Sequence, residues 1–333
     1  RKPITLLKGK FLNSKSGEGT RKVLVVVQYT ASMILLCGTL IVFAQLNFMR
    51  NQSLGVKTDQ TLVVKFPGRT EGMNTKLEAM KKAIARLPLV DKVTFSGAVP
   101  GEEVSTFLSN RRKSDALKQN RLYEMLVCDP DYIDAYGLQL VAGRGFSEDY
   151  GDDVNKLVVN ESAVRNLGIA SNEEALGEEI EVECTDAPMQ IIGVVKDYHQ
   201  QALNKNYTPI MLIHKDKIGW LPQRYISIVM KSGDPKELVS QVEEIWHRYF
   251  EDSSYDFFFL DQFFDHQYRQ DEVFGVMIGC FTGLAIFISC LGLWVLVMFS
   301  CTTRTKEMGI RKVLGATRWN LFYQLGKGFF QLI

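Results

Sequence analysis

Apolar positions gather in two long runs, and each run predicts a helix that crosses a membrane. The first extends from Val23 to Ala44 and the second from Val273 to Thr303, and neither contains an Asp, Glu, Lys, Arg or His residue. Each exceeds the roughly 20 residues that a helix needs to cross a bilayer. The first is too long for a signal peptide and no small-residue cleavage site follows it. We therefore expect a retained span that continues outward to about residue 50.

The distribution of charge predicts which side of the membrane each segment occupies. Residues 1–22 carry seven Lys or Arg and one acid, and residues 304–318 carry five and one. Residues 51–272 carry 25 Lys or Arg and 36 Asp or Glu, a net charge of −11 that the whole-chain value of +1 conceals. Basic residues beside a span stay in the cytoplasm. We expect a cytoplasmic lead-in (1–22), two spans (23–50 and 271–303), and an extracytoplasmic domain between them (51–270).

Both ends of the extracytoplasmic block show a strand, helix, strand pattern. Each first strand is a short β-branched run, and each helix has apolar residues at helical spacing. Asn74 is expected to cap the first helix, and Asp234 with Pro235 and Glu237 is expected to begin the second as a capping box. The expected elements are strand 61–66, helix 74–86, strand 90–96, strand 225–230, a helix from 235 and strand 255–260.

Between these units the pattern becomes mostly β. Short strands are expected at 157–160, 179–182 and 190–195, with a helix at 162–167. The predicted fold class is α-helical membrane spans plus an α+β extracytoplasmic domain. In that domain an α/β subdomain, residues 51–129 and 223–270, is split by a β-rich insert, residues 130–222.

The sequence contains none of the catalytic or metal-binding motifs that we sought. It has no phosphate-binding loop, no H-E-x-x-H, no C-x-x-C and no G-x-S-x-G. We therefore expect no catalytic residue, cofactor site or metal site in the chain. Cys128 and Cys184 are the two cysteines of the extracytoplasmic block, and they could form a disulfide or remain free.

The basic segment after the second run predicts a short amphipathic helix. Ile310, Val313 and Leu314 fall on one side of it, Arg311 and Lys312 point elsewhere, and Gly315 is well placed to end it. Such a helix can seat in a groove of a cytoplasmic partner. It can equally rest on anionic lipid, as basic cytoplasmic loops commonly do. The physical pattern leaves both interpretations open.

A resemblance to a known family bears on this choice. The segment Arg304-Thr305-Lys306-Glu307-Met308-Gly309-Ile310-Arg311-Lys312-Val313-Leu314-Gly315-Ala316-Thr317 resembles the loop signature of FtsX/MacB-like ABC transporter permeases. Further stretches are similar to the tandem-repeat permeases of that family, at 21–29, 143–146, 159–161, 192–199 and 290–293. The resemblance implies a multi-pass permease subunit in the bacterial inner membrane. It also implies a coupling helix within 304–318 that docks on an ATPase.

The resemblance assigns the ATPase contact to ten residues and the chemistry to another chain. ATP and Mg²⁺ would be held by a separate ATPase subunit, so this chain would not be an enzyme. A dimeric or pseudo-dimeric permease, a lipid bilayer and an envelope partner are the expected partners, and no nucleic acid is expected. The expected contact residues are Glu307, Met308, Gly309, Ile310, Arg311, Lys312, Val313, Leu314, Gly315 and Ala316.

The ends of the sequence suggest a fragment. It begins at Arg1 without Met, and residues 319–333 read as the start of a third span, because the thirteen residues from Leu321 are too few to cross a bilayer. A basic lead-in without an initiator Met suits the second unit of a tandem permease.

The expected mechanism is transmission of force from the coupling helix to the extracytoplasmic domain. Two other classes of protein share parts of this pattern. A transmembrane receptor also has two spans around an outer ligand-binding domain, but it would continue into a long cytoplasmic helix with heptads. A membrane-anchored hydrolase would need a nucleophile and base pattern that the sequence lacks.

Overall fold

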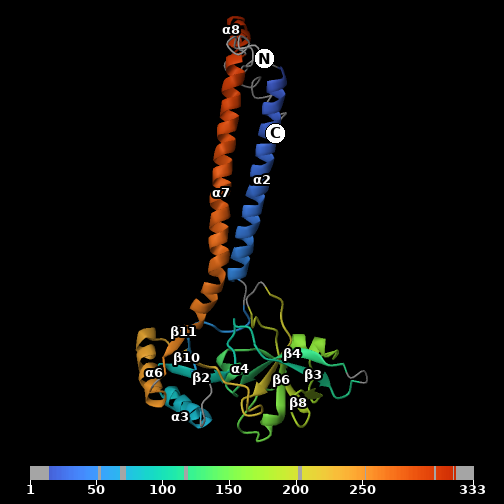
Figure 1. Ribbon diagram of the computed structural model, residues 1–333, viewed down its shortest axis with the longest axis vertical. Coiled ribbons are helices and arrows are strands. Elements are labelled where there is room, and N and C mark those ends of the chain that lie inside the picture. The colour runs from blue at the N-terminus through green and yellow to red at the C-terminus, as the bar shows by residue number, and fades with distance from the viewer. Residues whose placement is uncertain are drawn as a thin grey trace, which may run out of the picture. The chain divides into compact units, whose positions relative to one another are not determined.

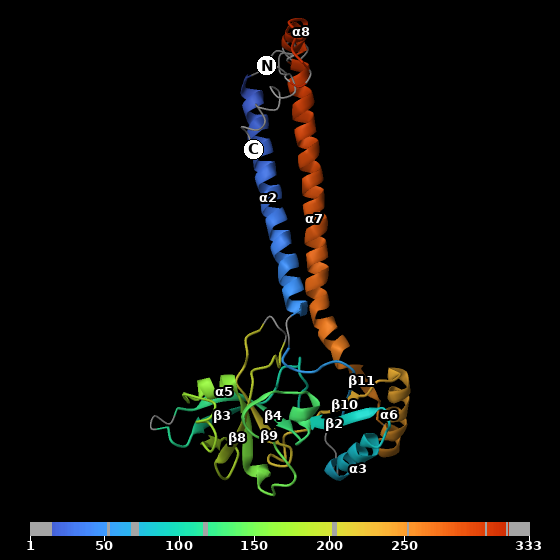
Figure 2. The same ribbon diagram turned by 180° about the vertical axis from the view of Figure 1, so that it is seen from behind.

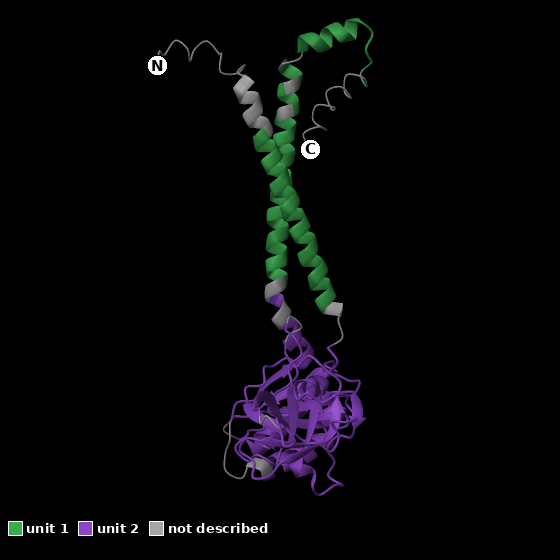
Figure 3. Cartoon of the chain, turned by 90° about the vertical axis from the view of Figure 1, so that its right-hand side faces the viewer, with its two compact units in different colours: residues 1–50, 270–333 green, residues 51–269 purple. Residues whose placement is uncertain are grey.

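The computed structural model describes residues 15–51, 54–67, 73–115, 119–201, 205–251, 253–303, 305–317 and 319. The chain divides into two compact units, coloured separately in Figure 3. Unit 1 comprises residues 1–50 and 270–333, and unit 2 comprises residues 51–269. Most of the basic lead-in and all but Trp319 of the expected third span lie outside the described residues.

Unit 1 is built on two long helices that lie side by side in Figures 1 and 2. They are α2 (Lys15–Asn51) and α7 (Leu260–Thr303), and a short helix, α8 (Thr305–Val313), follows. Val23–Met49 and Glu272–Phe299 are each long and apolar enough to cross a membrane. Only 11% and 12% of their most apolar windows are buried within the structure, which is unlike the core helix of a water-soluble protein.

Unit 2 is an α+β fold whose described strands form one 11-stranded sheet. The strands are β1 (Thr61–Lys65), β2 (Val90–Ser96), β3 (Phe107–Arg112), β4 (Arg121–Cys128), β5 (Leu140–Gly143), β6 (Lys156–Asn160), β7 (Glu179–Val182), β8 (Met189–Val195), β9 (Ile210–His214), β10 (Tyr225–Met230) and β11 (Asp256–Phe259). The helices are α3 (Met73–Ala85), α4 (Tyr132–Ala135), the 3₁₀ turn η2 (Asp153–Asn155), α5 (Glu161–Asn166) and α6 (Pro235–Tyr249), with the first residues of α7.

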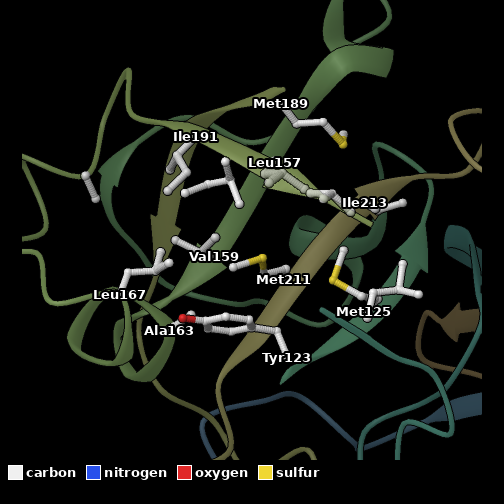
Figure 4. Packing of buried hydrophobic residues seen from close by; sticks show 14 of the residues in the cluster. Tyr123, Met125, Leu157, Val159, Ala163, Leu167, Met189, Ile191, Met211 and Ile213 are labelled. Atoms are coloured by element: carbon white, nitrogen blue, oxygen red, sulfur yellow. The ribbon is translucent and has the colours of Figure 1, made fainter. Parts of the chain in front are cut away.

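Six of these strands close into a barrel. Hydrogen bonds run in the order β4-β3-β7-β8-β6-β9, and β9 then pairs in parallel with β4. Side chains alternate across each strand, so Tyr123, Met125 and Val127 of β4 point inward. They meet Leu157, Val159, Ile191 and Met211 from the other strands, as Figure 4 shows. The barrel encloses the first hydrophobic core of the unit.

The barrel begins earlier in the chain than the β-rich insert expected from residue 130. β3 and β4 precede that position, yet they form part of the closed ring. Leu108 of β3 and Tyr123 of β4 pack in the same core as residues of β6 and β8. Without the two strands, the ring would have exposed edges at β7 and β9.

Of the other five strands, β5 pairs with β8 of the barrel and four form a layer covered by two helices. The order β11-β1-β10-β2 is antiparallel throughout, and α3 and α6 cover one face. Asp234 caps α6 by accepting a hydrogen bond from Lys236 N at 2.9 Å, with Pro235 next, as the sequence predicts. Glu237 instead accepts a hydrogen bond from Gln241, one turn further along, at 3.0 Å, so the expectation of a capping box between Glu237 and Asp234 is corrected. The opposite face packs against the outer side of the barrel in a second core.

A buried carboxylate joins the barrel to the layer. The registered pairing between β2 and β4 is confined to Ser96 and Cys128. Asp129, directly after β4, is buried and accepts hydrogen bonds from Phe95 N at 3.0 Å and from the Thr94 hydroxyl. Lys81 of α3 completes the set with an ion pair at 2.5 Å. Thus α3, β2 and β4 meet at one side chain.

Two further local expectations need correction, and one open question, the state of Cys128 and Cys184, is answered. α3 begins at Met73, so Asn74 lies inside its first turn rather than at the cap position. Leu260 is the first residue of α7 and not the last of the preceding strand. Cys128 and Cys184 are both free, and strand register explains why. Glu183 N bonds to Ser109 O, Ser109 pairs with Leu122, and Cys128 lies six residues further along β4. That distance is about 20 Å, far beyond disulfide geometry.

Two buried asparagines differ in how well their hydrogen bonds are satisfied. Asn110 points into the barrel, donates only to the sulfurs of Met125 and Met211, and leaves its Oδ1 without a hydrogen-bond partner in the described structure. Asn160 caps α5 and bonds to Ala163 N, Ile210 N and Thr208 O at 2.8–3.0 Å. The two side chains are equally buried, so they form a matched pair.

We predict opposite effects of the same substitution at these two positions. Asn110→Leu removes an unsatisfied polar group and should raise the free energy of unfolding by about 1 kcal/mol. Asn160→Leu loses three hydrogen bonds and should lower it by about 3 kcal/mol. Thermal unfolding of the full chain in detergent micelles measures both. Equal destabilisation by the two changes would contradict the assigned hydrogen bonding.

Candidate functional site

The ten residues expected to contact an ATPase lie together on α8 and the turn that ends it. Glu307 to Val313 belong to the helix, and Leu314, Gly315 and Ala316 form its carboxyl-terminal cap. Glu307 and Arg311, one turn apart, form an ion pair at 2.7 Å. The Thr305 hydroxyl, at the start of α8, donates to carbonyl groups at the end of α7.

Gly315 ends α8, as the sequence predicts. Its φ of +92° lies in the left-handed region that favours glycine. Ala316 N donates to Arg311 O at 3.0 Å and Gly315 N donates to Lys312 O at 3.2 Å, which together form a Schellman motif. The motif fixes where the apolar side of the helix stops.

The apolar side of α8 is uncovered in the described structure. The exposed fractions are 63% for Ile310, 88% for Val313 and 80% for Leu314, and no residue of the helix is buried. These three residues, which we call the apolar stripe, are spaced by three and four positions, so they share one side of the helix. An exposed apolar strip beside charged residues is typical of a protein or membrane contact.

Gly309 sits in the middle of α8 without a structural reason within the described chain. A β-carbon built at this position would have no atom within 4 Å. Glycine inside a helix lowers helix stability by about 1 kcal/mol relative to alanine. A glycine that destabilises its helix and touches no other part of the described chain is suited to close approach by a partner.

A second site lies within unit 2, where the first residues of α7 pack against a loop, and the sequence did not predict it. Leu260 and Phe264 are buried in the second core. Gly101, with a φ of +92°, lies under Phe264, and a β-carbon built there would be 2.8 Å from the Cζ of that ring. The spacing of Leu260 and Phe264 by four residues is a helical signal that could have indicated this contact.

Hydrogen bonds hold the loop that contains Gly101 in place. Gln200 O accepts from Gly101 N at 2.8 Å, and the Gln200 side chain donates to Val99 O and Glu102 O. Glu102 accepts from the Tyr225 hydroxyl at 2.8 Å, and burial together with this carboxylate raises the pKa of Tyr225. The loop is therefore rigidly attached to β10 and to the segment after β8.

Unit 2 also has a cleft on its surface. An open polar cleft of about 500 Å³ lies against β3 and β7, where Arg111 and Glu181 form an ion pair. Among the described residues there is no cluster of three or more His, Cys, Asp or Glu side chains that could hold a metal.

Two family models match the chain. The MacB-like periplasmic core domain matches residues 5–245, and the FtsX-like permease C-terminal model matches residues 279–330, which include α8. The chain belongs to the MacB/FtsX-type permease family. The resemblance of the loop signature to this family is thereby confirmed.

Among curated proteins, this permease is similar to the uncharacterized ABC transporter permease YvrN of Bacillus subtilis, with 22% identity over 216 residues, 59% of this chain and 50% of YvrN. It is also similar to the macrolide export ATP-binding/permease protein MacB of Sodalis glossinidius, with 25% identity over 275 residues, 78% of this chain and 39% of that protein. The chain thus spans half or less of the length of these relatives.

Among solved structures, the permease is similar to the periplasmic region of MacB from Actinobacillus actinomycetemcomitans. The identity is 16%, the TM-score is 0.44, and the match covers 64% of this chain and 94% of that one.

We predict that the contact between Gly101 and Phe264 can be isolated with a matched control. Gly101→Ala imposes both left-handed strain and a clash with the ring, whereas Gly168→Ala imposes strain alone, because nothing lies within 4 Å of its built β-carbon. Gly101→Ala should therefore be less stable than Gly168→Ala by about 1–3 kcal/mol. Adding Phe264→Leu should recover part of the difference in unfolding midpoint. Equal losses at both glycines would argue against the packing described.

Proposed function

We propose that this chain is the permease subunit of an ABC transporter of the MacB/FtsX type, and that it passes the work of ATP hydrolysis to its extracytoplasmic unit. ATP and Mg²⁺ are bound by an ATPase subunit, which we place on a separate chain. The names of some relatives combine ATP-binding and permease functions, and those of others give a permease alone. The protein lies in the bacterial inner membrane with residues 51–270 outside.

The observation that carries this proposal is the apolar stripe of α8. Three large apolar side chains are exposed beside Arg311 and Lys312, within the part of the chain that the FtsX-like model matches. A helix that exposes such a stripe can seat in a groove of a partner. We assign the contact with the ATPase to Glu307 through Ala316.

In the proposed mechanism, α7 transmits the force from α8 to unit 2. One helix runs from Leu260 to Thr303, with its first ten residues in unit 2 and the rest in unit 1. Closure of two ATPase subunits would displace α8, and α7 would carry the displacement to Phe264 and the loop at Gly101. No catalytic residue in this chain is needed. The permease would work as a dimer or pseudo-dimer, with a possible envelope partner outside.

A transmembrane receptor is the second candidate, because two apolar helices around an outer unit also describe that class. The match of residues 279–330 to the FtsX-like permease C-terminal model favours the permease. A receptor would have no stable complex with an ABC ATPase.

We predict that charge and bulk at α8 control association with the ATPase. Arg311→Glu breaks the pair with Glu307, and Gly309→Trp fills the space that we assign to the partner. Both should weaken co-purification of the full-length protein with a co-expressed ABC ATPase, or uncouple ATP hydrolysis from the permease. Unchanged association and unchanged hydrolysis would refute docking at α8.

Two control variants separate docking from helix stability and from lipid binding. Gly309→Ala should stabilise the isolated helix by about 1 kcal/mol, so weaker association in this variant points to the partner. The swap Glu307→Arg with Arg311→Glu keeps the ion pair and the net charge. Docking predicts loss of association in the swap, and a helix that merely rests on anionic lipid predicts wild-type behaviour.

A further inference from the structure

The facing sides of α2 and α7 follow a repeat close to 3.5 residues. On α7 this seam consists only of small residues, and on α2 it mixes polar and large apolar residues. Such a repeat keeps the same two sides together along the whole length of a helix pair. The seam comprises Gln28, Ser32, Thr39, Val42, Phe43 and Leu46 of α2, and Gly275, Gly279, Thr282, Ala285, Ser289 and Gly292 of α7.

The glycines of α7 make room for large side chains of α2. A β-carbon built at Gly275 would lie 3.0 Å from a methyl group of Leu46, and one at Gly292 would lie 2.9 Å from the Gln28 side-chain oxygen. These contacts lie toward opposite ends of the described seam. Small residues allow membrane helices to approach closely, so any displacement of α7 along α2 would replace these spaces by side chains.

Two hydroxyl pairs are buried inside the seam. Ser32 Oγ lies 2.7 Å from Ser289 Oγ, and Thr39 Oγ1 lies 2.7 Å from Thr282 Oγ1. Ser289 also bonds to Ala285 O and Thr39 to Leu35 O, both at 2.8 Å. One hydroxyl of each pair can donate across the seam while the other donates to its own helix, so every hydrogen is used.

The seam inverts the pattern of a water-soluble protein. The four hydroxyl residues are at most 8% exposed, whereas Leu40 and Phe287 on the same helices are 61% exposed. In lipid no water is available to replace a lost hydrogen-bond partner. A hydroxyl that loses its partner across the seam can then bond only to a backbone carbonyl. The two pairs are seven residues apart on both helices, so a displacement along the axis breaks both at once.

From this geometry we propose that the hydroxyl pairs lock the register of α2 and α7, so that the two helices move as one lever. Displacement of α8 would tilt or rotate the pair as a unit, and α7 would not slide along α2 as a piston. The proposal rests on the proposed function, since it specifies how the force assigned to α7 is carried. Ser32, Thr39, Thr282 and Ser289 are its positioning residues.

Cysteine cross-linking tests the register that the hydroxyl pairs are proposed to hold, with at least one member of a pair replaced in each variant. In a background where the six native cysteines are replaced, the in-register pair Ser32→Cys with Ser289→Cys is compared with the offset pair Ser32→Cys with Thr282→Cys. The offset is one heptad, about 10 Å along the axis. Oxidation in membrane vesicles should link the in-register pair about tenfold faster or more, because the offset pair lies beyond disulfide geometry. Thr39→Cys with Thr282→Cys gives an independent in-register pair.

The same measurement is repeated with the co-expressed ATPase, without nucleotide and with ATP plus vanadate. A register lock predicts that the in-register rate is the same in both states within about twofold, and that the linked permease still stimulates ATP hydrolysis. Offset linking that appears only with ATP, or failure of both in-register pairs to link, overturns the proposal. The two registers are also compared in the absence of the ATPase, so the lock is tested even if the ATPase does not bind. Loss of ATPase binding would count against the proposed function only.

Discussion

The buried carboxylate of Asp129 ties the barrel to the helix-covered layer of unit 2, in addition to the second hydrophobic core that they share. The two parts share little backbone pairing, since β2 and β4 register at one position. Asp129 adds a side-chain connection, because it accepts hydrogen bonds from Thr94 and Phe95 and forms an ion pair with Lys81. Lys215 after β9 also pairs with Glu78 of α3, so a second contact ties the barrel to the same helix. Under the proposed function, a load applied to the layer would therefore reach the barrel.

The two units bury opposite kinds of side chain, and α7 has residues in both units. In unit 2 its Leu260 and Phe264 are buried among apolar residues, as in any water-soluble core. In unit 1 its Thr282 and Ser289 are buried, and its large apolar residues face outward. Each arrangement is stable only in its own surroundings. The division between the two units falls near residue 270. A membrane boundary would be expected at this position, where buried apolar side chains give way to buried polar ones.

Much of the fold could be predicted because local patterns were strong. The runs of β1, β2, β8 and β10 are short and apolar, and α6 carries Asp234 and Pro235 at its start. Closure of the barrel could not be predicted, because the pairing of β4 with β9 joins residues about 85 positions apart and leaves no local signal. For the same reason the β-rich part was placed too late in the chain, and a bond between Cys128 and Cys184 remained open although register separates them.

The candidate sites divide in the same way. The helix within residues 307–316 could be predicted because a contiguous motif encodes both the helix and its Gly315 end, whereas its contact with an ATPase stays a prediction. The seat of Phe264 on Gly101 brings together two segments more than 160 residues apart, and only one of them shows a local pattern.

The stability of these connections bears on how force could pass through the chain. A chain that transmits force works only if its connections do not deform under the load that they carry. Phe264 packs closely against Gly101, the loop of Gly101 is held by the Gln200 hydrogen bonds, and two hydroxyl pairs join α2 to α7. α8, in contrast, has no buried residue of its own. Under the proposed function, the described chain is closely packed where it would carry force and uncovered where it would receive it, as a coupling helix would require.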